Sequence, residues 1–315
     1  MARNNAGVAL LPIKPLHLTI PPQGRRSIIE KPGACGGFAG ERQTVRRMTG
    51  IPNYMLIIRA KIVAIILLAI VSCRGNPLQP SLDDERRRDY IRKQEALDKV
   101  PGEANERKQR SLARLRTEGV PFIEHLPAIA TVAESKRRRT EEVAERALAL
   151  AFVAARAEGA SKRQIDKLVQ DFEAQNFFSP KERAFLGSNP SENDRAQFLW
   201  RYEAYWVLLW SLGFVDTLDR PDHTCDVPRS VKIVVDRGRA GFFRDAHLRS
   251  QSTQSEILEA ADLIYRYHWS VTDARLKNRP TPATLDADVV MERHHALNWL
   301  SGYMNQSWDD ISTDT

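Results

Sequence analysis

The chain has 315 residues, of which 42% are hydrophobic and 28% charged, and this composition excludes a chain that is disordered throughout. Its formal net charge of +7 raises the question of nucleic acid. However, residues 1–72 hold 10 Lys or Arg and only 2 Asp or Glu, so the rest has 37 basic and 38 acidic residues, a balance of −1. The basic charge therefore argues for a nucleic-acid binder only if the first 72 residues belong to the working protein.

Residues 1–54 contain proline-rich and glycine-rich stretches and show little helix or strand periodicity. We predict that this segment is disordered or arises from a wrongly assigned start site, with the natural start at Met48 or Met55.

Residues 55–72 have the pattern of a secretory signal. Met55 is followed by Arg59 and Lys61, and then by ten apolar residues that end at Val71. As a helix those ten residues would span roughly 15 Å, about half of a bilayer's hydrocarbon core. The length suits the apolar region of a signal peptide, which typically has about 7–15 residues.

The signal ends in "IVSC", which resembles the lipobox of bacterial lipoproteins, with Cys73 at the modified position. The resemblance implies lipidation of Cys73, cleavage before it, and anchoring to a membrane on the periplasmic or cell-surface side. An uncleaved anchor or a chance apolar run is the alternative. Only Cys225 follows Cys73, so the exported chain would form no internal disulfide.

Residues 73–101 read as a polar tether followed by a highly charged helix over 83–100. The globular domain is expected over 102–315. Its first predicted helices, which show apolar stripes or capping residues, cover 103–119, 140–159, 161–176 and 179–187. Gly119 is expected to end the first of them, and Thr140, Ser161 and Ser179 to cap the next three.

The second half continues mainly in helices. Residues 191–214 are apolar on nearly all sides from Phe198, which predicts the central buried helix. Residues 230–238 are rich in β-branched side chains and fit a strand as well as a helix. Two long helices are expected at 255–278 and 286–304. We therefore predict a mainly α fold, a compact bundle of about seven helices with at most a small β element.

Five stretches carry a family resemblance: "RKQRSLARLRTEGVPFIEHLPAI", "TEEVAERALALAFVAA", "SPKERAFL", "FLWRYEAYWVLLWSLGF" and the ending "VVMERHHALNWL…SWDDISTDT". Together they resemble domain of unknown function 4272 from about residue 107 to the C-terminus. The resemblance implies no activity and transfers no catalytic residue. The lipobox is a departure, since many relatives resemble plain intracellular proteins.

Four residues are weak candidates for a catalytic site. Arg201 and Glu203 lie in the apolar 191–214 helix, where a charge is costly unless it is paired. A buried ion pair with an arginine such as Arg275 or Arg266 explains them, or else Glu203 is a carboxylate with a raised pKa in an aromatic pocket. His268 and Asp273 fall on one face of the 255–278 helix, which is otherwise an aromatic, core-like stripe.

The sequence favours a lipid-anchored, extracytoplasmic helical module that binds an unknown protein or small molecule. We expect no cofactor, no metal and no nucleic acid. The alternative is a membrane-anchored, hydrolase-like enzyme that uses Glu203, Arg201, His268 and Asp273 around a pocket between the two long helices. A sealed ion pair at Glu203 would weaken that alternative, and convergence of these groups on an open cleft would strengthen it.

Overall fold

The computed structural model describes residues 81–99, 101–247 and 251–315. The predictions for residues 1–54, for the signal peptide at 55–72 and for Cys73 therefore lie outside the described residues. Asp84–Thr315 form one compact unit. Within the described ranges every regular element is a helix, so the prediction of a mainly α fold is confirmed. No described helix has the length and apolar character needed to cross a bilayer.

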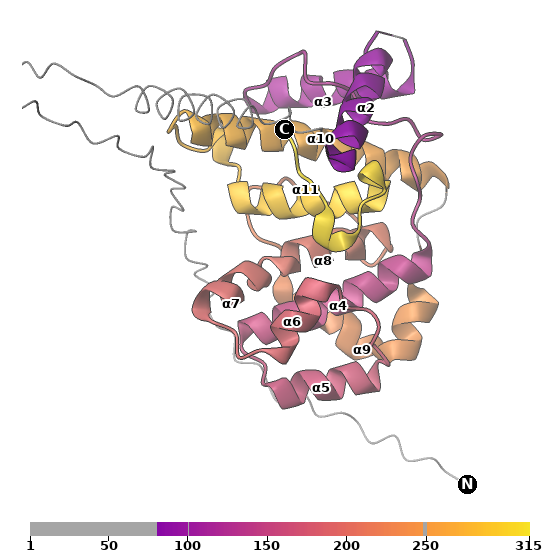
Figure 1. Cartoon of the computed structure of the whole chain (residues 1–315), viewed down its shortest axis with the longest axis vertical. Helices are drawn as coiled ribbons and strands as arrows, with labels where there is room; N and C mark the ends of the chain where they lie inside the picture. The colour runs from indigo at the N-terminus through magenta and orange to yellow at the C-terminus, as the bar shows by residue number, and fades with distance from the viewer. Residues whose placement is uncertain (1–80, 100, 248–250) are drawn as a thin grey trace, which may run out of the picture. The chain divides into compact units, whose positions relative to one another are not determined.

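Most of the helices follow one another with short connections, whereas the segments 119–139 and 212–226 are longer (Figure 1). The α-helices are α2 (Leu82–Leu97), α3 (Glu103–Glu118), α4 (Thr140–Glu158), α5 (Lys162–Asp171), α6 (Pro180–Gly187), α7 (Glu192–Leu199), α8 (Arg201–Ser211), α9 (Val227–Asp245), α10 (Gln251–Leu276) and α11 (Ala287–Ser301). Three short 3₁₀ turns are η1 (Pro282–Thr284), η2 (Tyr303–Asn305) and η3 (Trp308–Asp310).

Local sequence signals set most helix ends. The Ser161 and Ser179 side chains each accept a hydrogen bond from a backbone N–H in the first turn, within full capping boxes, as predicted. Gly119 ends α3 with a φ of 68°, a left-handed conformation that glycine adopts without steric cost. Thr140 is the first residue of α4 rather than its cap. Arg139 holds the cap position, with no side-chain hydrogen bond to the helix.

Two segments, residues 191–214 and 230–238, were not assigned by the sequence as the structure has them. Residues 191–214 form two helices, because the chain bends at Trp200, where the Glu203 N–H bonds the Trp200 carbonyl at 2.9 Å. The bend separates α7, which has no fully buried residue, from the almost wholly buried α8. Residues 230–238 lie in α9 and not in a strand. This helix is kinked at Gly238, where φ is 57°.

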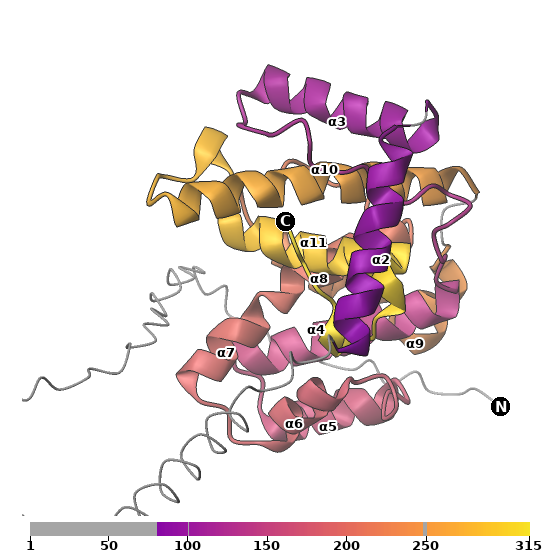
Figure 2. The same cartoon turned by 45° about the horizontal axis from the view of Figure 1, so that its top comes forward.

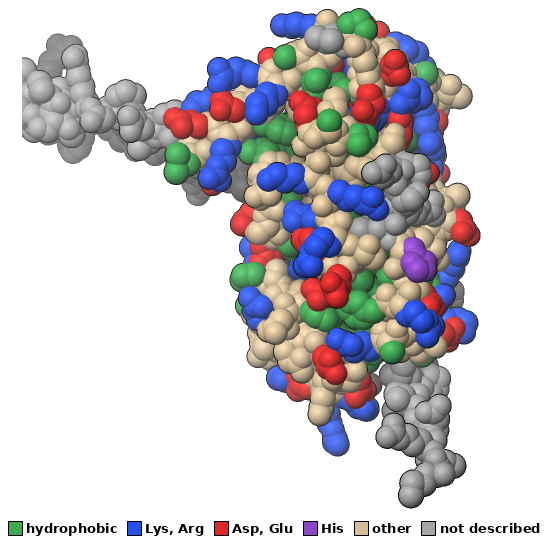
Figure 3. All heavy atoms as spheres, turned by 90° about the vertical axis from the view of Figure 1, so that its right-hand side faces the viewer, with side chains coloured by type: hydrophobic (Ala, Val, Ile, Leu, Met, Phe, Trp, Pro, Cys, Tyr) green, Lys and Arg blue, Asp and Glu red, His purple; other side chains and the backbone are tan. Residues whose placement is uncertain are grey.

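The core forms around α4 and α8, and α11 packs on α8. The last two α-helices, α10 and α11, lie side by side, and α3 packs on α10 (Figures 1 and 2). Helix α2, which the sequence assigned to the region before the globular domain, passes across α10 in both views and across α11 in Figure 2. Figure 3 shows acidic and basic side chains interspersed on one face of the described chain.

Candidate functional site

Glu203 lies in a sealed part of the core. The residue is 2% exposed, and its Oε2 accepts a hydrogen bond from Arg293 Nε of α11 at 3.1 Å. Its Oε1 accepts the backbone N–H of Cys225 at 2.5 Å. Both carboxylate oxygens are therefore engaged by the protein. The buried ion pair that the sequence left open is therefore present, but its partner is Arg293 and not Arg275 or Arg266; Arg266 pairs with Asp262 instead.

Arg201 forms a second ion pair between the same two helices. Its Nη1 lies 2.8 Å from Oε2 of Glu292, which precedes Arg293 in α11. Burial raises the pKa of Glu292, although the Arg201 guanidinium opposes the shift. The two pairs place alternating charges across the α8–α11 contact, and each charge has an opposite charge beside it. Such an arrangement offsets the desolvation of charged groups.

His268 and Asp273 occupy two other places along α10. His268 Nδ1 lies 2.8 Å from His294 Nδ1, so one ring donates its proton to the other. Burial lowers the pKa of His268 to about 4 and that of His294 well below its usual range, so both rings are neutral at pH 7. Asp273 lies near the end of α10, paired with Lys277 and Arg279 at 2.6 and 2.9 Å.

A cleft of about 500 Å³ opens between α3 and α10, with the end of α8, the loop 216–221 and α11 forming the rest of its wall. We call it the α3–α10 cleft. It is lined by Arg110, Ser111, Arg114, Trp210, Asp216, Thr217, Leu218, Asp219, Arg220, Pro221, Glu256, Glu259, Ala260, Leu263, Ile264, Tyr267, Arg293 and Leu297. None of the four predicted site residues lines it.

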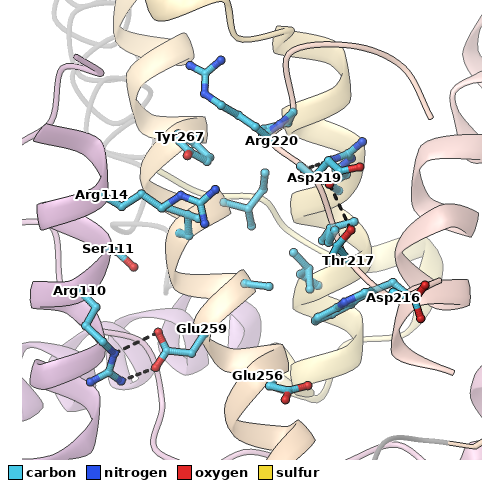
Figure 4. A pocket seen from close by; sticks show the side chains of 18 residues that line it. Arg110, Ser111, Arg114, Asp216, Thr217, Asp219, Arg220, Glu256, Glu259 and Tyr267 are labelled. Atoms are coloured by element: carbon cyan, nitrogen blue, oxygen red, sulfur yellow. Dashed lines mark hydrogen bonds and ion pairs between the residues drawn. The ribbon is translucent and has the colours of Figure 1, made fainter. Parts of the chain in front are cut away.

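The lining combines an apolar floor with charges of both signs. Trp210, Leu263 and Leu297 supply apolar surface, whereas four arginines and four acidic residues surround it. Figure 4 shows Arg220 and Tyr267 toward one end and Asp216 and Glu256 toward the other. At the rim, Arg110 of α3 pairs with Glu259 of α10. The cleft therefore suits a ligand that carries opposite charges on an apolar body.

Glu118, at the end of α3, organises the basic end of the cleft. It accepts hydrogen bonds from Arg114 Nε at 2.8 Å, from Arg220 Nε at 3.1 Å and from the Tyr267 hydroxyl. Burial raises the pKa of Glu118, but these three donors outweigh it, and the net shift is downward. The network holds the Arg114 and Arg220 side chains in place. Neither arginine can release a proton, because guanidinium groups stay protonated. This end of the cleft is built to hold charge rather than to transfer protons.

Arg293 connects the cleft to the sealed core. It lines the cleft, yet it is only 2% exposed, and its guanidinium bonds Glu203 and the Asp219 carbonyl, the latter at 2.7 Å. It therefore anchors the loop 216–221 to α11. The Arg114–Glu118 pair has the i, i+4 spacing that sequence can reveal. Arg293 carries no such signal, because its partners lie far away in the chain. Arg220 pairs with the nearby Asp222, but its contact with Glu118 joins residues 102 positions apart.

The described residues contain no group of three or more His, Cys, Asp or Glu side chains arranged to hold a metal ion. Cys225 is half-buried with a free thiol, and its Sγ lies 3.5 Å from the Tyr202 carbonyl. Burial raises the pKa of this thiol well above its usual range, which disfavours the reactive thiolate.

Residues 107–311 match the model of a family described as a domain of unknown function (DUF4272). The matched region spans the whole α3–α10 cleft, whereas α2 lies outside it. Neither the curated proteins nor the solved structures contain a match to this chain.

Proposed function

The chain belongs to the DUF4272 family, and we propose that it is a membrane-tethered helical binding protein that takes its ligand in the α3–α10 cleft. The observation that carries this proposal is the cleft itself, about 500 Å³ with an apolar floor and fixed charges of both signs. Its volume lies in the range of small-molecule sites. The ligand would carry a positive and a negative group on an apolar body.

The enzyme alternative has less support from the geometry. Glu203 is held by Arg293 and Cys225, Arg201 by Glu292, and His268 by His294. These groups do not converge on the α3–α10 cleft, and Glu203 has no open path to a substrate at 2% exposure. A general acid or base must come within hydrogen-bond reach of the atom that it serves. We therefore rank binding above catalysis.

Filling the cleft tests the binding proposal. Ala260 lines the cleft on α10, whereas Ala113 is exposed on α3, so Ala260→Trp and Ala113→Trp add the same bulk at a cleft and a surface position. Full-chain protein is extracted from its membrane in mild detergent, and its bound mass is measured by native mass spectrometry. We expect a bound small molecule on the wild type and on Ala113→Trp, and its loss from Ala260→Trp. A mass retained by Ala260→Trp, or no mass on the wild type, would contradict the proposal.

The tether is proposed from the sequence alone. Residues 55–72 fit a lipoprotein signal, and Cys73 fits the modified position, so the domain would work on the periplasmic or cell-surface side of a membrane. Radioactive fatty acid should label the wild-type chain and not Cys73→Ala, and the variant should move to the soluble fraction. A labelled or membrane-bound Cys73→Ala would refute lipid attachment at this residue.

A further inference from the structure

A second cavity of about 450 Å³ lies under α2, bounded also by the segment 123–130, α10 and α11. We call it the α2 chamber. It shares no lining residue with the α3–α10 cleft, because the two cavities use different faces of α10 and α11. An inference about the chamber is therefore independent of the proposed function.

The chamber has aromatic walls from three elements. Tyr90 comes from α2, Tyr265 and Trp269 from α10, and Tyr303 from η2. The rings of Tyr90 and Tyr303 meet edge to face with centroids 4.8 Å apart. Burial raises the pKa of Tyr303 to about 12, so its phenol stays neutral at pH 7. Aromatic faces that surround a space attract cations through their quadrupoles.

Two residues that line the chamber, Gln94 and Asp314, each have a buried side-chain oxygen without a hydrogen-bond partner among the described residues. Gln94 is the only residue of α2 that is fully buried, with 5% exposure, and its Oε1 has no donor. Asp314 pairs with Arg87 at 3.0 Å through Oδ1, but its buried Oδ2 also has no donor. A buried acceptor without a donor is costly. Both groups would be satisfied by a ligand that donates hydrogen bonds.

The charges of the lining also favour a positively charged ligand. Glu95, Glu134 and Asp314 line the chamber, and Arg87 is the single Lys or Arg among its described lining residues. His294 adds no charge at pH 7, because burial lowers its pKa well below the usual range. The acidic excess and the acceptors without a donor share only Asp314, and the aromatic walls come from other residues. Each of the three features favours a positively charged donor.

We propose that the α2 chamber binds a protonated primary amine on an aromatic or short aliphatic body, with the ammonium group donating to Gln94 Oε1 and Asp314 Oδ2 and the body packing among the tyrosines. Helix α2 is then one wall of a binding site rather than only the end of a tether.

The test is calorimetric titration of the full chain with three probes of similar shape: phenethylammonium, phenethyl alcohol and phenylacetate. We expect the ammonium to bind with a Kd below about 1 mM and the neutral and anionic probes at least tenfold more weakly, a ratio of about 1.4 kcal/mol. Equal binding of the alcohol or the anion would overturn the proposal, as would no binding of the ammonium.

Variants link the binding to the chamber. Gln94→Leu removes an unsatisfied acceptor, so it should weaken ammonium binding about tenfold or more while leaving thermal stability unchanged or raised. Glu141→Gln, at an exposed position of α4 that lines neither cavity, is the control and should leave the Kd unchanged. Ammonium binding that survives Gln94→Leu, or that is lost in Glu256→Gln of the α3–α10 cleft, would place the site elsewhere and refute the assignment.

Discussion

The buried carboxylate of Glu203 gives the sharpest prediction about stability. Glu203→Gln keeps a side-chain oxygen for the Cys225 N–H but removes the negative charge beside Arg293. Arg293, which is 2% exposed, then keeps its hydrogen bond to the Asp219 carbonyl at 2.7 Å. The variant therefore leaves a cation in the core without its counter-charge.

Removing one partner of a buried pair typically costs about 3–5 kcal/mol, because the remaining charge is desolvated and uncompensated. For a domain of this size, each kcal/mol lowers Tm by about 2–4 °C, so the expected fall is roughly 6–20 °C. Arg293→Met should cost a similar amount, since it leaves Glu203 uncompensated. The double variant should cost less than the sum of the two single variants, with a coupling of up to about 3 kcal/mol.

Urea unfolding followed by far-UV circular dichroism measures these differences. Glu141→Gln, at an exposed position of α4, is the matched control and should change stability by less than about 0.5 kcal/mol. The ion-pair interpretation would be wrong if Glu203→Gln cost less than about 1 kcal/mol. A gain in stability would instead indicate a strained functional carboxylate, because such groups often lower stability.

Further predictions concern pH and backbone conformation. Burial lowers the pKa of His268 to about 4 and that of His295 to about 3. As the pH falls below about 6.5, these two side chains therefore take up a proton in the unfolded chain before they do so in the folded chain. Each histidine should therefore lower the free energy of unfolding by about 2 kcal/mol between pH 7 and pH 5. Urea unfolding at the two pH values should show a smaller fall in this free energy for His295→Gln than for the wild type. An equal fall in the two proteins would contradict the prediction. Gly119 and Gly302 both have a left-handed φ, but a Cβ at Gly119 meets open space whereas one at Gly302 meets the Lys136 carbonyl oxygen at 2.8 Å. Thermal unfolding should show a loss of about 1–2 kcal/mol for Gly119→Ala and a larger loss for Gly302→Ala; equal losses would argue against the close contact.

The parts of the fold that sequence predicted are those fixed by neighbours in the chain. The caps at Ser161 and Ser179 and the stop at Gly119 each depend on at most five consecutive residues. The mainly α class follows from the same local periodicity. The bend at Trp200 was missed because the residues on both sides of it favour a helix, so the change from the polar α7 to the apolar α8 was interpreted as burial of one end of a single helix.

The candidate site was harder to predict, because its contacts join distant parts of the chain. The sequence indicated that Glu203 needed a cation, but Arg293 lies 90 residues away and is identified only by the packing of α8 on α11. The α3–α10 cleft likewise depends on how α3 packs on α10. A β-branched run such as 230–238 was ambiguous for a related reason: tertiary packing, not intrinsic preference, keeps it in α9.

The most direct test of the central claim is a crystal structure of the full chain purified in mild detergent from the cells that produce it, without added ligand. The account predicts a bound molecule in the α3–α10 cleft that contacts Trp210 and Tyr267, with an acidic group toward Arg220 and a basic group toward Glu256. A cleft that contains only solvent in protein prepared in this way would contradict it.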